Sequence, residues 1–374
     1  MRTSCIALFL SLMVLPLCAQ RRVAPINAGT PEGLFLVQIR DEPDDAKKLA
    51  LMDQFLAQYP KHEGALWVYS QITTIGSKLG QFDKAMAAAE KLLAQDPADL
   101  EIALAAVKAA EAKKDPDAVR QWAVRSSDLA RKGVQTPKAQ DEDGDAFKQR
   151  VDFAKQVDTY TEYALYAAAL QAPEAAKRAE LLKALDQRAP ESTYLSQAYG
   201  LYFLALVQSG DMPAAVVVAE KVIAKGQGTE EMLATAGDFY LRQNTEPQKV
   251  LDYSAKLIEL AGARPKPGGV SDADWQKRKD SFLGLGQWMT GALYSSQGKF
   301  SEADKVLRAA LPLLEGNDQL KAGALYNLGL ANQRLKNLPD AMKFYEQCVA
   351  IQSPYQPLAT GNLKGLKSAY RVVK

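Results

Sequence analysis

The chain has 374 residues, of which 24% are charged and 8% are aromatic, and its formal net charge is +2. This length allows a large buried core, and this composition excludes an intrinsically disordered chain. The near-neutral balance removes any bulk electrostatic argument for binding nucleic acid or an anionic membrane surface. The composition therefore predicts a folded globular or repeat protein whose partners are not nucleic acids.

The first 19 residues have the pattern of a secretory signal peptide. Arg2 supplies a positive end, residues 5–15 are apolar, and residues 17–19 offer a small-residue cleavage site before Gln20. The apolar run is shorter than the ~20 residues that a membrane-spanning helix needs. We therefore expect a mature chain that begins at Gln20 and is exported to the periplasm or cell exterior, with no membrane span.

Cys18 allows a second interpretation, the lipid-modified cysteine of a bacterial lipoprotein. The residue before such a cysteine is normally small, whereas here it is Leu17, which follows Pro16. Ordinary cleavage after Ala19 is therefore the prediction. Residues 20–43, which follow, are expected to form an extended leader.

Cleavage would leave the mature chain with one cysteine, Cys348, and one histidine, His62. A single thiol cannot form an internal disulfide or a cysteine metal cluster. The apolar helical surroundings of Cys348 predict a buried core thiol, and a covalent link to a partner is the alternative. A lone histidine in a loop cannot supply the three or four ligands of a zinc site, so we expect His62 to be exposed.

One turn recurs four times along the chain. Each copy begins with a glycine or its substitute, has an apolar residue two positions later, and has an alanine three positions after that. The copies lie at residues 80–85, 210–215, 298–303 and 336–341. Glycine permits the positive φ that ends a helix, and alanine allows the next helix to pack closely. Four copies of one turn indicate a repeat built from helix pairs.

Amphipathic helical patterns flank these turns. Ala85, Ala89 and Leu92 fall on one face of a helix that ends before Pro97. Small residues at crossing points, with larger residues between them, allow paired helices to interlock. Single amphipathic helices are expected at residues 44–56 and 359–372, where they would cap the ends of the stack.

The most complete copy resembles a known repeat family. Its residues are Leu325, Leu328, Gly329, Asn332, Ala341, Tyr345 and Pro354. In this order they are similar to the tetratricopeptide pattern W-x-x-L-G-x-x-Y…A-x-x-x-F…P. Weaker copies centre on Gly237 and Gly291 and on residues 69–97, and the resemblance covers most of the chain from about residue 46. Equivalent alanines are 33 to 40 residues apart rather than a uniform 34, so the repeats are degenerate.

The resemblance implies an all-α fold, a right-handed α–α superhelix of about six helix pairs with capping helices. The N-terminal repeats would occupy residues 44–132 and the central repeats residues 146–262. The C-terminal repeats and a capping helix would occupy residues 270–374. Gly- and Pro-containing insertions at residues 133–145 and 263–269 are expected to be loops.

The resemblance also implies a groove, because the first helix of each pair lines the concave face in this family. Transferring that register to this chain places eight residues in a partner-binding groove: Trp67, Gln71, Asp238, Arg242, Trp288, Tyr326, Asn327 and Arg334. Aromatic residues and arginine dominate binding hot spots. The alternative for Trp67 and Trp288 is that they fill space between adjacent helix pairs.

Two further patterns resemble ligand sites only partly. Residues 141–145 are rich in carboxylates that calcium favours, but Gly144 comes too early for an EF-hand loop. An acidic start to the following helix, favoured by the helix dipole, is the simpler interpretation. Gly284 and Gly286 lack the third glycine and the preceding strand of a dinucleotide-binding loop, so we expect them to allow close helix packing.

We therefore expect no catalytic residue, metal or cofactor, and a protein or peptide of unidentified sequence as the partner. The predicted function is a non-catalytic interaction scaffold of a bacterial cell envelope that holds the partner in its groove. One alternative is an envelope hydrolase that uses two carboxylates on the same solenoid, which the missing His, Cys or metal constellation disfavours. A purely structural spacer is the other alternative.

The signal peptide generates the first prediction. Expression with the natural N-terminus in a secreting host should yield a chain that begins at Gln20, because the apolar run and the cleavage site match those that signal peptidase recognises. Intact mass spectrometry of the exported protein measures this directly. A retained Met1, or the added mass of a diacylglyceryl group on Cys18, would contradict the assignment.

Overall fold

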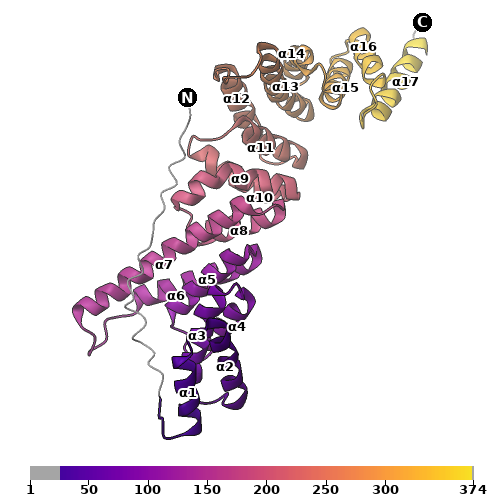
Figure 1. Ribbon diagram of the computed structural model, residues 1–374. Helices are drawn as coiled ribbons and strands as arrows, with labels where there is room; N and C mark the ends of the chain where they lie inside the picture. Colours follow the sequence, from indigo (N-terminus) through magenta and orange to yellow (C-terminus); the bar gives the residue numbers. More distant parts are fainter. Residues whose placement is uncertain (1–25, 373–374) are drawn as a thin grey trace. The chain divides into compact units, whose positions relative to one another are not determined.

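All regular secondary structure in residues 26–372, the part of the chain that the computed structural model describes, is helical (Figure 1). The chain forms two compact units that meet between Ala205 and Leu206, inside α9 (Thr193–Ser209). The first unit contains α1 (Pro31–Asp41), α2 (Asp45–Gln58), α3 (Ala65–Lys78), α4 (Phe82–Leu93), α5 (Leu100–Lys113), α6 (Pro116–Gln135), α7 (Gly144–Gln171) and α8 (Ala175–Arg188). The second contains α10 (Met212–Ala224), α11 (Glu230–Gln243), α12 (Pro247–Ala263), α13 (Asp272–Ser296), α14 (Phe300–Ala310), the 3-10 helix η2 (Leu311–Leu314), α15 (Asp318–Arg334), α16 (Leu338–Val349) and α17 (Gln356–Val372).

Consecutive helices pack as pairs within each unit. The pairs in contact are α1–α2, α3–α4, α5–α6 and α7–α8 in the first unit, and α11–α12, α13–α14 and α15–α16 in the second. The first helix of a pair also contacts the first helix of the next pair, as α3 does with α5 and α13 with α15. This is the all-α repeat architecture expected from the sequence, and the described residues hold more pairs than the predicted six.

All four predicted turns adopt the left-handed backbone conformation that their glycine position requires. Gly80, Gly210 and Gly298 have φ values of +74°, +83° and +75°, and Lys336 takes the same conformation with φ +64°. Five residues after each of them comes an alanine that is completely buried. The turn therefore fixes where the second helix begins, and the alanine fixes how closely it can approach the first.

Glycines within the helices allow a second kind of close contact between paired helices. A Cβ atom added at Gly329 would lie 2.5 Å from the ring of Tyr345, and one added at Gly291 would lie 2.5 Å from Leu307. Gly284 faces Leu313 and Leu314 in the same way, which confirms its expected packing role. Paired helices in the second unit thus contact each other where one of them lacks a side chain.

The predicted extended leader is wrong for residues 31–41, which form α1. Thr30 caps this helix by accepting a hydrogen bond from the backbone N–H of Gly33 (3.2 Å), and Pro31 occupies a first-turn position that suits proline. Leu36 and Ile39 are fully buried in a cluster with residues of α2 and α3. Consequently α2 is not a lone capping helix, whereas α17 is a single helix after the last pair. The signal peptide and residues 20–25 lie outside the described residues.

The α6–α7 connection is organised by one side chain. Arg150 donates hydrogen bonds to the carbonyl oxygens of Gly133 (2.8 Å), Thr136 (3.3 Å) and Pro137 (3.4 Å), and it forms an ion pair with Glu142 (2.9 Å). The Arg150 guanidinium holds the pKa of Glu142 below its ordinary value. The helix-free segment is residues 136–143, shorter than the predicted loop at residues 133–145, because α6 continues to Gln135.

The acidic run at residues 141–145 contributes to this connection and to the start of α7. Asp143 caps α7 by accepting a hydrogen bond from the backbone N–H of Asp145 (2.9 Å). Together with the Glu142–Arg150 ion pair, this cap supports the interpretation of an acidic helix start. The second predicted loop, residues 263–269, corresponds to the connection between Ala263 at the end of α12 and Asp272 at the start of α13.

The structure confirms the predicted burial of Cys348 but not the predicted exposure of His62. Cys348 is fully buried, its thiol lies 3.4 Å from the carbonyl oxygen of Ala322, and burial raises its pKa to about 11, so the core-thiol prediction is confirmed. His62 is half-buried rather than exposed as predicted. Its Nδ1 accepts a hydrogen bond from the backbone N–H of Gly64 (3.0 Å), and its ring packs edge-on against Phe55 at 5.6 Å.

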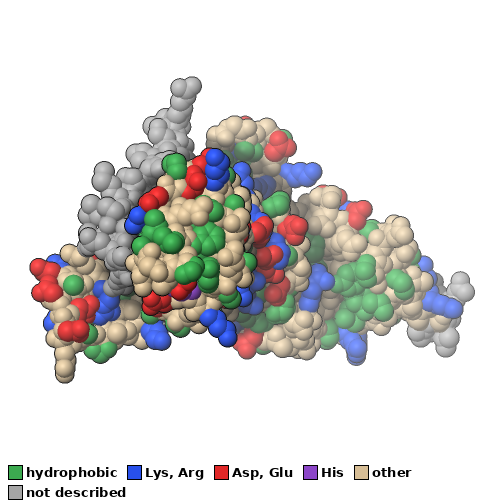
Figure 2. Space-filling model, turned by 60° about the horizontal axis from the view of Figure 1, so that its bottom comes forward, with side chains coloured by type: hydrophobic (Ala, Val, Ile, Leu, Met, Phe, Trp, Pro, Cys, Tyr) green, Lys and Arg blue, Asp and Glu red, His purple; other side chains and the backbone are tan. Residues whose placement is uncertain are grey.

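The visible surface mixes both signs of charge. In the view of Figure 2, Lys and Arg side chains alternate with Asp and Glu side chains, as the near-neutral composition leads one to expect. No helix within residues 26–372 has the combination of length and hydropathy needed to cross a bilayer.

The close approach at Gly329 generates the second prediction. Gly329→Ala should lower the free energy of unfolding by about 1–3 kcal/mol, because the new methyl group would push against the buried Tyr345 ring. Thermal unfolding followed by circular dichroism measures the change.

Gly361→Ala is the matched control. Gly361 lies in α17 with no atom within 4 Å of an added Cβ. This substitution should leave the stability unchanged or raise it by about 0.5–1 kcal/mol, as alanine does in an open helix position. Equal effects of the two substitutions would show that α15 and α16 are not as close as described.

Candidate functional site: the inner helices of the second unit

The first helices of successive pairs form one layer in the second unit. α11 contacts α13, α13 contacts α15, and α15 contacts α17. Six of the eight residues predicted to bind a partner lie on this layer: Asp238, Arg242, Trp288, Tyr326, Asn327 and Arg334. Their surroundings decide which of them are available to a ligand.

Tyr326 stacks between two other tyrosines. Its ring centroid is 5.5 Å from that of Tyr355 and 6.1 Å from that of Tyr345. Tyr345 is fully buried, burial raises its pKa to about 12, and its hydroxyl donates to Oε1 of Gln333 (2.9 Å) and accepts from Nδ2 of Asn362 (3.0 Å). Tyr326 and Tyr355 are only half-buried. The buried ring of Tyr345 therefore supports Tyr326, which in turn contacts Tyr355, and the last two remain partly accessible.

A charged pair lies beside these tyrosines. Arg242 Nε donates a hydrogen bond to Asp238 Oδ2 at 2.6 Å across one turn of α11, and the Arg242 side chain is 70% exposed. Burial raises the pKa of Tyr355, while the charge of Arg242 lowers this pKa and that of Asp238 raises it. Tyr326 contacts Tyr355, and the charges of Asp238 and Arg242 act on the Tyr355 hydroxyl. We call these four residues the tyrosine face.

Trp288 does not belong to the accessible part of this face. It is 5% exposed, and a Cβ atom added at Gly323 would lie 3.0 Å from its Nε1 and 3.1 Å from Cε2 of Tyr355. The indole therefore packs between α13 and α15, next to Tyr355. Its N–H has no hydrogen-bond partner among the described residues. This position agrees with the alternative interpretation, in which Trp288 fills space between helix pairs, and its contact with a partner stays a prediction.

Asn327 and Arg334 lie on the same helix as Tyr326. The Asn327 amide donates to the carbonyl oxygen of Gly323 (2.9 Å), so part of its hydrogen-bonding capacity is used within α15. Arg334 is exposed, and its positive charge acts on the nearby Tyr345 hydroxyl. It forms no ion pair with any residue in the described part of the chain.

Trp67 and Gln71 belong to α3 in the first unit and are both half-buried. Trp67 packs against the cluster that includes Leu36, Phe55 and Val68. The predicted groove residues are therefore distributed over two compact units, and the tyrosine face contains none of those from the first unit.

Sequence reasoning missed Tyr355, the residue around which the face is organised. In the sequence, Pro354 marks the end of a repeat, and Tyr355 directly after it is not part of any amphipathic helical pattern. Tyr355 reaches Tyr326 only because the chain turns back between α16 and α17. An aromatic residue directly after a repeat-ending proline was the one available signal.

A polar cluster on the neighbouring helices holds α11 in place. Oε1 of Glu220 accepts hydrogen bonds from Lys249 Nζ (2.9 Å), Tyr253 OH (2.7 Å) and Tyr240 OH (3.0 Å), which joins α10, α11 and α12. Desolvation acts to raise the pKa of Glu220, but the three hydrogen bonds and the charge of Lys249 outweigh it and lower this pKa. The cluster therefore stabilises the fold through an ionised carboxylate.

The arrangement around Tyr355 suits binding. It offers two amphipathic rings, the Arg242–Asp238 pair and the unpaired guanidinium of Arg334, the residue types that anchor protein interfaces. Within residues 26–372 no cluster of three or more His, Cys, Asp or Glu side chains is arranged to hold a metal ion.

The Glu220 cluster generates the third prediction. Glu220→Gln should lower the free energy of unfolding on the order of 1–3 kcal/mol at neutral pH, because charge-assisted hydrogen bonds are lost. Since the folded pKa of Glu220 is lowered, its contribution is present above the ordinary glutamate pKa of about 4.5 and is lost as pH falls through the folded pKa. Thermal unfolding of both proteins between pH 7 and pH 3 measures this, and their difference should shrink on acidification.

Glu302→Gln provides the comparison for that experiment. Glu302 is an exposed residue of α14 that forms no ion pair in the described structure, so its substitution should change stability little at any pH. A Glu220 effect that persisted unchanged to pH 3 would show that the charge of Glu220 does not contribute.

Comparisons with known proteins agree with the local repeat. Residues 322–355, which include most of α15, all of α16 and Tyr355, match the tetratricopeptide repeat family. No curated protein matches the chain in sequence.

Two solved structures are similar to the chain at 12% identity each. The tetratricopeptide repeat domain of P58(IPK) aligns over 92% of this chain and 99% of its own length, with a TM-score of 0.29. Yeast Tom70 aligns over 91% of this chain and 87% of its own length, with a TM-score of 0.25. Because these TM-scores are low, the classification of the chain as a helical-repeat protein rests on the matched repeat and on the helix pairs described above. The chain is an all-α helical-repeat protein that contains a tetratricopeptide repeat at residues 322–355.

Proposed function

We propose that this protein is a non-catalytic interaction scaffold and that the tyrosine face binds a segment of a partner protein. Helical repeat proteins use the extended surface lined by successive repeats for binding. The observation that carries the proposal is the half-buried Tyr326–Tyr355 stack, together with the effect of the exposed Arg242 charge on the Tyr355 hydroxyl. A packing role would require neither the exposure of these rings nor a charged pair beside them.

The chemistry of the face indicates which partner segment it suits. Tyr326 and Tyr355 offer apolar ring surface with a hydroxyl at one end, which suits an apolar or aromatic side chain of the partner. Arg334, which forms no ion pair with any residue between 26 and 372, lies on the same helix as Tyr326, and it suits an acidic residue further along the segment. The partner is therefore expected to carry an apolar residue and an acidic residue a few positions apart.

The place of action is part of the same proposal. The signal pattern of residues 1–19 supports export, so the partner would be met in the periplasm, in the cell envelope or outside the cell. The single buried thiol of the mature chain is compatible with an oxidising compartment, because it is neither exposed nor ionised at neutral pH.

The fourth prediction tests the tyrosine face. Tyr326→Ala and Tyr355→Ala should each weaken partner binding about thirtyfold, the effect of losing a hot spot worth about 2 kcal/mol. The partner is first isolated by affinity capture from the envelope fraction of the source organism, and titration calorimetry then measures its affinity for each variant. Circular dichroism should show the same helical content in all proteins.

Val217→Ala is the control, because it removes a side chain that is 54% exposed on α10 and lies outside the tyrosine face. Its affinity for the partner should equal that of the unmodified chain. If both tyrosine variants also bind like the unmodified chain, the partner binds elsewhere and the proposal fails.

A further inference from the structure

Positive charge is concentrated in the last repeat and the helix that follows it. Residues 330–374 contain seven Lys or Arg residues and two Asp or Glu residues, a net charge of +5, whereas the whole chain carries +2. Both acids of this region already have a cationic partner, because Asp340 pairs with Arg308 (2.6 Å) and Glu346 pairs with Lys367 (2.7 Å). The near-neutral balance of the whole chain therefore conceals a local excess of positive charge.

Two contacts fix the level of α17 against α15. The ring of Tyr326 lies 5.5 Å from that of Tyr355, directly before α17, and the side chains of Gln333 and Asn362 both hydrogen-bond to the Tyr345 hydroxyl (2.9 and 3.0 Å). Gln333 is seven positions after Tyr326, and Asn362 is seven positions after Tyr355. The two helices therefore run in the same direction and in step with each other.

This register brings three exposed cations to one edge of the last repeat. Arg334 and Lys336 lie on either side of Leu335 at the end of α15, and Lys364 of α17 is level with Leu335. None of these three cations forms an ion pair with a residue between 26 and 372. The Leu335 side chain is 47% exposed. We call these four residues the basic edge.

We propose that the basic edge binds the surface of an anionic lipid bilayer. Lys and Arg side chains near such a surface are attracted by its negative potential. The exposed Leu335 side chain would enter the boundary between headgroups and acyl chains, where apolar side chains of peripheral proteins are buried. Arg334 and Lys336 would contact lipid phosphates on either side of it.

Two features favour a lipid surface over an acidic protein as the partner. The basic edge consists of cations and one aliphatic side chain, without the aromatic residues that anchor protein interfaces and that the tyrosine face supplies. It also includes the turn that begins at Leu335, whereas helical repeat proteins bind protein segments along the surface lined by successive repeats. Lipid headgroups require charge and an apolar side chain but no fixed arrangement of hydrogen-bonding groups.

Co-sedimentation with lipid vesicles tests the proposal on the chain that begins at Gln20. Vesicles of phosphatidylcholine alone are compared with vesicles in which phosphatidylglycerol replaces part of the phosphatidylcholine. At about 0.1 M NaCl the chain should bind the anionic vesicles at least tenfold more tightly than the neutral ones. At about 1 M NaCl most of this difference should disappear, because the Debye length falls from about 10 Å to about 3 Å.

Three variants locate the binding. A chain with both Lys336→Glu and Lys364→Glu should bind anionic vesicles at least tenfold more weakly, since each cation near the surface contributes roughly fivefold. Leu335→Asn should weaken binding about threefold without changing the salt dependence, because it removes an apolar side chain but no charge. The control carries Lys256→Glu and Lys277→Glu, the same change of net charge at two exposed positions of α12 and α13, and its affinity should stay within about twofold of the unmodified chain. Circular dichroism should show equal helical content in all proteins.

Four results would overturn the proposal. The first two are no binding to either kind of vesicle and equal binding to both. The third is an equal loss of binding in the control, because net charge rather than the basic edge would then decide binding. The fourth is displacement of the chain from vesicles by soluble polyglutamate together with an unchanged affinity of Leu335→Asn, which would show that the edge fits an acidic protein instead. Tyr355→Ala should leave vesicle binding intact, so this test and that of the tyrosine face can fail separately.

Discussion

Within the second unit, the distance between paired helices depends on glycines that face a large side chain of the partner helix. Gly329 admits the ring of Tyr345 and Gly291 admits Leu307, each so closely that a single methyl group would collide. Tyr345 is held in this contact, and Tyr326 stacks on it. The position of the accessible tyrosines therefore depends on residue 329 of α15 being a glycine, which has no Cβ atom. Close packing of interiors makes such contacts sensitive to one carbon atom.

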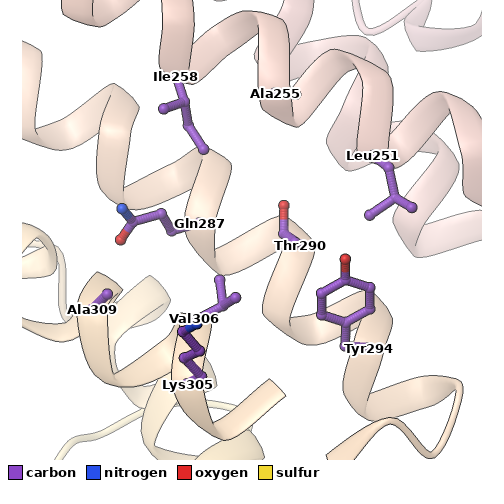
Figure 3. A pocket seen from close by; sticks show the side chains of 9 residues that line it. All are labelled: Leu251, Ala255, Ile258, Gln287, Thr290, Tyr294, Lys305, Val306 and Ala309. Carbon is purple, nitrogen blue, oxygen red and sulfur yellow. The ribbon is translucent and has the colours of Figure 1, made fainter. Parts of the chain in front are cut away.

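α13 contributes residues to two different parts of this unit. It contacts α11, α12, α14 and α15. Trp288 packs next to Tyr355 of the tyrosine face, whereas Gln287 and Tyr294 line a hollow between α12, α13 and α14 (Figure 3). One helix therefore supplies residues to both places.

Features that depend on neighbours in sequence were predictable, and features that depend on distant residues were not. The turns at Gly80, Gly210 and Gly298 follow from a local pattern, and so do the helices that flank them. The similar turn at Asn244 lacks the glycine and was missed, although its φ is +52°. α1 was missed because Pro31 and Gly33 weaken the helical pattern, while its stability comes from burial of Leu36 and Ile39.

The same distinction applies to the candidate site. The register of the repeat correctly placed Asp238, Arg242 and Tyr326 on one layer of helices, because a helix position determines the side on which a residue lies. It could not separate exposed from buried residues on that layer, and Trp288 is one of the buried residues. It also could not find Tyr355, Glu220 or the hollow between α12, α13 and α14, since these arise from the meeting of three or more helices.

The way in which Arg150 holds the α6–α7 connection has an evolutionary consequence. Its three hydrogen bonds to backbone go to carbonyl groups, which every amino acid possesses. Side chains at residues 138–141 are exposed and contribute little to the order of the segment. Mutations can therefore accumulate there without loss of its conformation, as long as Arg150 and Glu142 persist. The connection is a place where homologous chains can diverge, or acquire new surface chemistry, while the helices that it joins remain the same.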